Sequence, residues 1–464
     1  MNELEKIFNE KKTENGDKCY KSTGNNLTDL FFMTAYFEKH LDEVTIGESN
    51  KEKVFAMFIR DARFGLGRRD LGRKLMKLSK VNPEYIVKAG RFDDLYHIAS
   101  DDCIKYLEKQ LVLGNELCKK WMPRLTGKDK KIAKALCKMW EISEKEYRNL
   151  IKTDKTVEYK LSYAEQIKGT PLNDVFKQGE FVHPLVADID FEKVPSLAMT
   201  KYLHTFSTRE DLKERFSDYI QAVKEEKAKI NTKTANVYDG YKTATMDCWA
   251  PQSVEMEARE VVSNKIVDNA TEGVEMNAIV ILDSSGSMNW ERIDGGTLLD
   301  KAYSIAYGIS TKSTYAPNQI ISFSSTPKLM TIKGNTMKQK YASMYTGDCT
   351  NTDFKKVMDL LQGLKKYPEF LIVLSDMEFD EGSYQSKKNT MQIFKEHGAN
   401  TKIIWWNLNN RNKTVPEFDE YGNIYLSGYN LQIMKLLENK MNMETYIETI
   451  LKKYIKDVDI DVEI

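Results

Sequence analysis

The sequence lacks the features that mark secreted, disulfide-rich or membrane-spanning proteins. Its six cysteines, spread over 464 residues, include no CxxC pair, so neither a disulfide framework nor a structural zinc site is expected. No run of 18 apolar residues occurs, and the first residues, MNELEKIF, lack the apolar core of a signal peptide. These absences predict a soluble, cytoplasmic protein without a membrane span.

The motifs of several enzyme classes are missing as well. The five histidines form no HExxH motif, and the sequence holds no GxSxG nucleophile elbow and no P-loop. The segment GLGRRD at residues 65–70 lacks the third glycine of a dinucleotide-binding fingerprint. We therefore expect that the protein is not an enzyme. Carboxylates beside a bound cation leave phosphodiester hydrolysis as a minor alternative.

The charge balance identifies no partner for the whole chain, because Lys plus Arg and Asp plus Glu both number 69. The positive charge is nevertheless concentrated in residues 51–160, while the segments before and after are slightly acidic. The length predicts two or three domains, since single cores rarely grow beyond about 250 residues.

The first half of the chain has apolar residues at helical spacing and almost no alternating runs. Short turns separate the helical stretches, which predicts an all-helical array of paired helices at residues 26–230. Residues 1–25 are expected to be a partly ordered lead-in and residues 231–275 a connector. Amphipathic stretches fall, among other places, at 101–121, 129–140, 143–151, 195–206 and 209–229.

The second half, residues 276–464, alternates short apolar runs with amphipathic stretches. This alternation predicts an α/β domain with a mostly parallel sheet. The expected strands are 276–283, 318–324, 328–332, 369–375, 402–408 and 423–427. The expected helices are 298–312, 353–365, 387–397 and a terminal set at 430–456.

Oxygen-bearing side chains follow the expected strands of this domain. Asp283, Ser285 and Ser287 come at alternate positions after one buried strand, and Asp376 follows another. Thr352 lies in a polar loop before a helix. Because ligands bind at the carboxyl ends of parallel strands, these loops can converge on one ion. Hard oxygen donors without His or Cys predict Mg²⁺ or another divalent cation as cofactor.

We expect Ser285, Ser287 and Thr352 to bind the cation directly, and Asp283 and Asp376 to hold coordinated waters. This arrangement leaves a coordination position that an acidic group of a partner protein could fill. Two alternatives stay open. The segment DSSGS can be merely a capped turn between a strand and a helix, and Thr350 is a rival for the place of Thr352.

These motifs resemble a known family. The DxSxS pattern at 283–287, a Thr in the second loop and an Asp in the third resemble the metal-ion-dependent adhesion site (MIDAS) of von Willebrand A domains. The segments TGNNLTDLFF, IRDARFGLGRRDL, GRFDDL, SDMEFD and LSGYN resemble an uncharacterised family that joins a TROVE-like helical module to such a domain. That family resembles the Ro autoantigen family, in which HEAT-like helical repeats form a ring.

The resemblance implies an RNA-binding, ring-like component of a ribonucleoprotein. Cationic side chains recur at helical spacing in the basic segment and could follow a phosphate backbone. The alternative is that these lysines only form a solvated helix face. A different functional class is also open: a protein-interaction scaffold whose Mg²⁺ captures a partner's carboxylate without nucleic acid. The candidate RNA-binding residues are Arg69, Arg73, Lys77, Lys119, Lys120, Arg124, Lys130, Lys134 and Lys138.

Overall fold

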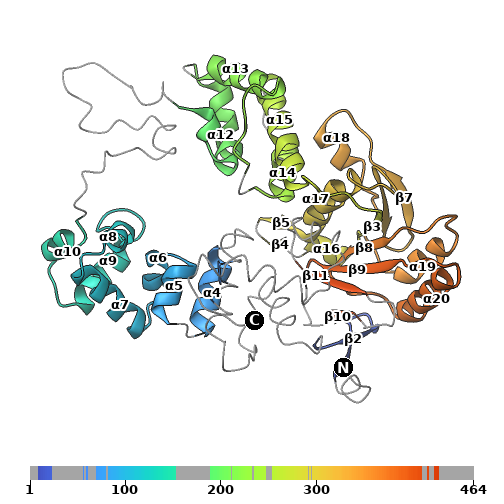
Figure 1. Cartoon of the computed structure of the whole chain (residues 1–464), viewed down its shortest axis with the longest axis horizontal. Helices are drawn as coiled ribbons and strands as arrows, with labels where there is room; N and C mark the ends of the chain where they lie inside the picture. Colours follow the sequence, from blue (N-terminus) through green and yellow to red (C-terminus); the bar gives the residue numbers. More distant parts are fainter. Residues whose placement is uncertain are drawn as a thin grey trace. The chain divides into compact units, whose positions relative to one another are not determined.

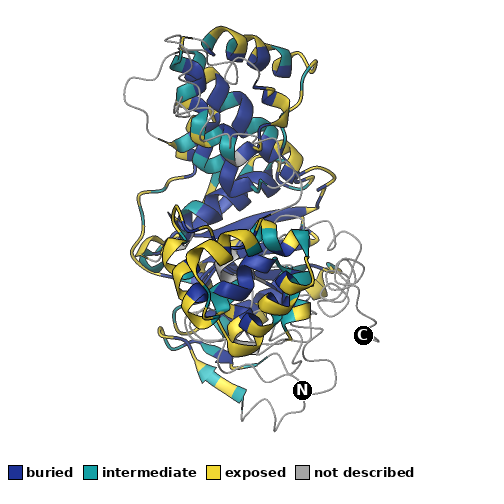
Figure 2. Ribbon diagram, turned by 90° about the vertical axis from the view of Figure 1, so that its left-hand side faces the viewer, coloured by how far each residue is buried: buried dark blue, intermediate teal, exposed yellow. Residues whose placement is uncertain are grey.

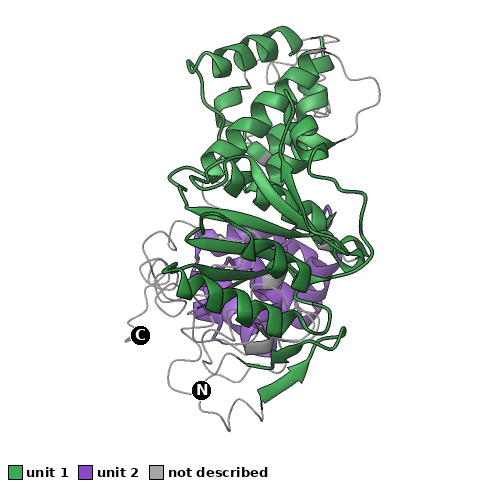
Figure 3. Cartoon of the chain, turned by 90° about the vertical axis from the view of Figure 1, so that its right-hand side faces the viewer, with its two compact units in different colours: residues 1–24, 161–442 green, residues 25–160, 443–464 purple. Residues whose placement is uncertain are grey.

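The computed structural model divides the chain into two compact units (Figure 3). Unit 1 comprises residues 1–24 and 161–442, and unit 2 comprises residues 25–160 and 443–464. None of the described helices is both long and apolar enough to cross a membrane. The predicted terminal helices at 430–456 lie outside the described residues. The structure describes residues 9–22, 56, 59–60, 69–79, 82–152, 189–210, 212–232, 235–246, 253–290, 292–293, 295–409, 415–416 and 423–427.

The described part of unit 2 is helical, as predicted. The stretch expected as one helix at 101–121 is two, because Gly114 adopts a φ of +74° and the Asn115 side chain caps the second helix by accepting from Cys118 N. The helices are α4 (Arg69–Ser79), α5 (Pro83–Ala89), α6 (Phe92–Ile98), α7 (Asp101–Val112), α8 (Glu116–Trp121), α9 (Lys130–Met139) and α10 (Glu144–Leu150).

Unit 1 begins its helical part with η4 (Phe191–Lys193), α12 (Ser196–Thr208) and α13 (Lys213–Lys224). The expectation of a connector at 231–275 is wrong, because this segment forms α14 (Val237–Thr245) and α15 (Ser253–Ala270). The apolar residues of α15 are spread around the helix, which leaves no amphipathic stripe to read in the sequence.

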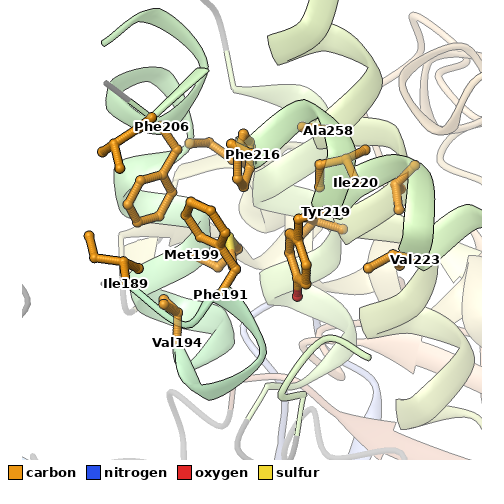
Figure 4. Close-up of a cluster of buried hydrophobic side chains, with 14 of the residues drawn as sticks. Ile189, Phe191, Val194, Met199, Phe206, Phe216, Tyr219, Ile220, Val223 and Ala258 are labelled. Carbon is orange, nitrogen blue, oxygen red and sulfur yellow. The ribbon is translucent and has the colours of Figure 1, made fainter. Parts of the chain in front are cut away.

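Figure 4 shows Phe191, Phe206, Phe216 and Tyr219 packed with aliphatic side chains of α12, α13 and α15 into one buried cluster.

The α/β part of unit 1 holds a six-stranded sheet in the order β11-β9-β8-β3-β6-β7 (Figure 1). Among the described strands of this sheet, only β7 is antiparallel to its neighbour, so the expectation of a mostly parallel sheet is confirmed. The strands are β3 (Ala278–Asp283), β6 (Gln319–Phe323), β7 (Lys328–Thr331), β8 (Phe370–Ser375), β9 (Lys402–Asn407) and β11 (Ile424–Ser427).

Helices lie along this sheet and bury its central strands. Every residue of β3 and of β8 is buried, in keeping with their continuous apolar sequences (Figure 2). Helix α20 begins at Ser383, four residues before the predicted start at 387. The helices are α16 (Gly286–Trp290), α17 (Leu298–Ser310), α18 (Met337–Ala342), α19 (Phe354–Gln362) and α20 (Ser383–Glu396), with a small hairpin of β4 (Arg292–Ile293) and β5 (Gly296–Thr297) between α16 and α17.

The order of the strands determines where a ligand can bind. From β3 the chain passes to β6 on one side, and it later returns to β8 on the other side of β3. The loops that follow β3 and β8 therefore leave the carboxyl ends of these two neighbouring strands in opposite directions. Such a place is the switch point of an open α/β sheet, where ligands bind.

The N-terminal segment belongs to this α/β part. Strands β1 (Glu10–Lys12) and β2 (Lys18–Tyr20) form an antiparallel hairpin, and β2 also pairs with β10 (Val415–Pro416). Most of the expected lead-in is thus an ordered part of unit 1. Strands of three residues give almost no alternating pattern, so the sequence did not reveal them.

Candidate metal centre

The first loop of the centre continues directly from β3. Asp283 ends the strand and is fully buried, and its Oδ1 accepts the Ser285 N–H at 2.9 Å. Helix α16 starts at Gly286, so Ser287 lies in its first turn. The Ser285 and Ser287 hydroxyl oxygens are 3.1 Å apart. The DxSxS spacing thus gathers a carboxylate and two hydroxyl groups within one tight turn.

The second loop packs closely on the first. A Cβ atom on Gly286 would lie 3.0 Å from the Cys349 carbonyl oxygen, so the backbones approach each other at a position that favours glycine. The Ser284 hydroxyl lies 2.9 Å from the Phe323 carbonyl and 3.2 Å from the Asp348 carbonyl, and can donate to either. Ser284 therefore points away from Ser285 and joins the two loops.

Within the second loop, burial distinguishes the two candidate threonines. Thr352 is 4% exposed, and its carbonyl accepts the Asp380 N–H of the third loop at 3.1 Å. Thr350 is exposed, and its hydroxyl donates to Asp348 Oδ1 at 3.0 Å. These contacts favour Thr352 as the residue that faces the other loops.

The third loop follows β8 and is tied to the first loop. Ser375 donates its hydroxyl hydrogen to Asp283 Oδ2 at 2.6 Å. Against the effect of burial, the Ser287 side chain of the first loop lowers the pKa of Asp376 in the third loop. Oδ1 of Asp376 accepts the Glu378 N–H at 3.3 Å. Oδ2 of Asp376 is buried and accepts no hydrogen bond from any residue that the structure describes.

The two central carboxylates are in an unfavourable environment without a cation. Burial raises the pKa of Asp283, although the hydroxyls of Ser285 and Ser375 partly offset it. Burial also raises the pKa of Asp376, and the nearby charge of Asp283 raises it further. In the described part of the chain, no basic side chain pairs with either carboxylate. A bound cation would compensate both charges, so the residues fit one.

The donor set determines which kind of metal would fit. The described residues contain no group of three His, Cys, Asp or Glu side chains that could hold an ion. The centre instead combines serine and threonine hydroxyls with two carboxylates. Hard oxygen donors of this kind suit Mg²⁺ better than a soft metal.

Two family models match parts of this chain, and both describe domains of unknown function. DUF7788 matches residues 277–460, which include all three loops, and DUF2828 matches residues 100–237. An uncharacterised protein of Acanthamoeba polyphaga mimivirus is 24% identical over 516 residues, covering 96% of this chain and 87% of that protein. The crystal structure of the Deinococcus radiodurans RO (RSR) protein is similar at 12% identity and a TM-score of 0.49, covering 90% of this chain and 100% of that one.

The candidate RNA-binding lysines of α9 form an exposed stripe. Lys130, Lys134 and Lys138 recur at every fourth position of this helix, and all three are exposed. Lys134 also forms an exposed ion pair with Glu144 at 3.2 Å. An exposed pair of this kind is weak, so the stripe remains accessible to a polyanion.

Several other candidate RNA-binding side chains have intramolecular partners. The Arg73 guanidinium pairs with Asp94 at 2.9 Å and with Asp93 at 3.1 Å, so it contributes to the packing of α4 on α6. Lys119 is half-buried beside Glu116 on α8.

The remaining candidates differ in exposure. Arg124 is exposed and donates to the Ile151 carbonyl at 3.3 Å. Lys77 and Lys120 are exposed, and the side chain of Arg69 lies outside the described residues. The nine candidates therefore do not form a uniform set, and the α9 stripe is its most accessible part.

Proposed function

We propose that this protein is a cation-dependent binding protein. Asp283, Ser285, Ser287, Thr352 and Asp376 would hold Mg²⁺ or another divalent cation at the carboxyl end of the sheet, as the MIDAS of a von Willebrand A domain does. The observation that carries this proposal is the buried Oδ2 of Asp376, which accepts no hydrogen bond from any described residue, on a carboxyl group that also lies within the electrostatic influence of the buried Asp283.

The proposed ligand set defines what the site can bind. Ser285, Ser287 and Thr352 would contact the cation directly, while Asp283 and Asp376 would hold its waters. An octahedral cation with three protein hydroxyls and two such waters keeps one position for an acidic group of a partner. We propose binding without catalysis, because a site whose direct ligands are hydroxyl groups has few bases that could activate water for hydrolysis.

Mg²⁺ binding to the purified chain, measured by isothermal titration calorimetry, tests the proposal. Ser285→Ala and Thr352→Val should each weaken Mg²⁺ binding by about tenfold or more, because each removes a direct ligand. Thr350→Val is the matched control for Thr352→Val, since the exposed Thr350 hydroxyl donates to Asp348. A wild type that binds no Mg²⁺, or equal affinities in all three variants, would rule the site out.

We propose RNA binding by unit 2 as a second function, within a TROVE-like, HEAT-like module of a ring-forming ribonucleoprotein. The observation that favours it is the exposed stripe of Lys130, Lys134 and Lys138 on α9. A row of lysines on one helix face attracts a phosphate backbone largely without regard to sequence.

The salt dependence of RNA affinity tests this second function. Replacing the three α9 lysines with Gln should reduce the slope of log affinity against log salt by about 2 for single-stranded RNA, at about 0.7 per phosphate contact. The matched control replaces the exposed Lys355, Lys388 and Lys395 of unit 1 with Gln. If both triple variants bind a fluorescently labelled RNA alike, or the wild type binds none, the α9 stripe is only a solvated surface.

A further inference from the structure

The turn between β1 and β2 lies against the third loop of the candidate metal centre. The Glu14 backbone N–H donates to Glu378 Oε2 at 2.7 Å across 364 positions of sequence. The Asn15 side-chain amide donates to the Glu378 carbonyl at 3.0 Å. Both the carboxylate and the backbone of the buried Glu378 are thus held from the N-terminal turn.

The neighbouring residues extend this contact along the loop. The Thr13 hydroxyl donates to the Phe379 carbonyl at 3.3 Å, and Gly16 forms an isolated antiparallel bridge with Asp380. The turn itself is closed by a hydrogen bond from Gly16 N to the Thr13 carbonyl at 3.0 Å, with Gly16 at a φ of +93°. A turn closed by its own hydrogen bond therefore meets three consecutive residues of the third loop.

The third loop needs such support because its backbone is strained. Met377 lies between Asp376 and Glu378 and has a φ of +67°, a region that residues with a Cβ atom rarely adopt. Such a conformation persists only where surrounding contacts hold it. Ser375 holds one side by accepting the Met377 N–H at 2.9 Å, and the N-terminal turn holds Glu378 on the other side.

We propose that the Thr13–Gly16 turn positions the metal centre. By binding Glu378 it holds Met377 in its left-handed conformation and keeps the Asp376 carboxylate directed at the cation. The link to Asp376 is direct, because the Glu378 N–H donates to Asp376 Oδ1 at 3.3 Å. This inference rests on the proposed cation site, and it assigns to the N-terminal hairpin a role in setting the affinity of that site.

Removing the backbone N–H group of Glu14 tests the inference. Glu14→Pro removes the N–H that donates to Glu378, and Glu14 is the second residue of the turn, where proline is favoured. Glu14→Ala is the matched control, because it removes the same side chain and keeps the N–H. We expect the Pro variant of the full chain to bind Mg²⁺ about tenfold or more weakly, the usual effect of losing an outer contact of a metal site. The Ala variant should bind like the wild type.

A second variant decides the matter if the proline variant does not fold. Asn15 is exposed, and Asn15→Asp exchanges its amide donor for an acceptor that faces the Glu378 carbonyl. It should also weaken Mg²⁺ binding while the melting temperature measured with EDTA stays near that of the wild type. That pair of readouts separates positioning of the site from a general loss of stability.

A double-mutant cycle shows whether the effect passes through Glu378. Glu378→Ala should weaken Mg²⁺ binding, and adding Glu14→Pro to it should cost no further affinity. If the wild type binds Mg²⁺ and the Pro and Ala variants of Glu14 bind it equally, the inference is overturned and the cation site stands. A wild type that binds no Mg²⁺ overturns both.

Discussion

Ser284 and Ser285 are adjacent in the sequence, yet their hydroxyl groups have different partners. Ser284 faces the Phe323 and Asp348 carbonyls and joins two loops, whereas Ser285 faces Ser287 inside the centre. The alternate spacing of DxSxS predicted which of the two would be a ligand candidate. The contacts are consistent with that choice, although cation binding itself stays a prediction.

A buried carboxyl group makes the stability of the N-terminal hairpin depend on pH. Burial raises the pKa of Asp17 from 3.8 to about 6, although the Lys18 backbone N–H and the Lys387 charge lower it. The pKa of Asp17 is higher in the folded protein than in the unfolded chain, so the folded protein favours the protonated carboxyl group. The contribution of Asp17 to stability is therefore complete below about pH 4 and is lost as the pH rises through about 6.

We therefore expect the wild type to lose stability relative to Asp17→Asn between pH 4 and pH 7. Two pKa units correspond to at most about 3 kcal/mol in the free energy of unfolding. Urea unfolding of both proteins at several pH values measures the difference. If that difference does not change with pH, Asp17 has an ordinary pKa in the folded protein.

At the scale of elements, α15 depends on a buried ion pair. Glu255 is fully buried and accepts from Arg259 Nη2 at 2.7 Å, and its other oxygen lies 2.8 Å from His204 Nδ1 on α12. These contacts join α15 to α12 in the segment that the sequence suggested was a connector. Polar residues that lower the helix signal of α15 therefore help to hold it in place.

Glu255→Ala should lower the free energy of unfolding by about 3 kcal/mol or more, because it leaves the buried Arg259 without this carboxylate. Glu257→Ala on the same helix removes a half-exposed pair with Lys224 and should cost less than about 1 kcal/mol. Chemical denaturation of the two variants compares them directly. Equal losses would mean that the Glu255 pair contributes no more than a surface contact.

Helix α4 provides a similar test in unit 2. Arg73→Ala removes the guanidinium that pairs with Asp93 and the fully buried Asp94, so we expect a loss of about 3 kcal/mol in unfolding free energy. Lys77→Ala, one turn later and exposed, should change it by less than about 0.5 kcal/mol. If the Arg73 variant keeps its stability but binds RNA more weakly, Arg73 is instead part of the RNA-binding surface.

Across the whole molecule, the sequence predicted the elements whose signal is local. Buried parallel strands such as β3 and β8 have continuous apolar runs, and α9 has a clear stripe of lysines, so both were found near their true bounds. Features that depend on distant partners were not found. Strand β2 pairs with residues 415–416, and Glu378 meets Glu14 across 364 positions, and no local pattern records such contacts.

The same division holds for the candidate centre. Four of the five proposed site residues follow from spacing and from their places at strand ends, because a parallel sheet brings its carboxyl ends to one edge. Thr352 was predicted from its polar loop before a helix. The supporting contacts of Ser375, Met377 and Glu378 came only from the structure, since they depend on hydrogen bonds and on one left-handed backbone conformation.

The most direct measurement is the anomalous diffraction of a crystal of this protein grown with Mn²⁺ in place of Mg²⁺. We predict one strong peak roughly 2 Å from the hydroxyl oxygens of Ser285, Ser287 and Thr352. The peak should be absent from crystals of Asp283→Ala grown in the same way. No peak at these hydroxyls, or Mn²⁺ bound only elsewhere, would contradict the proposed metal centre.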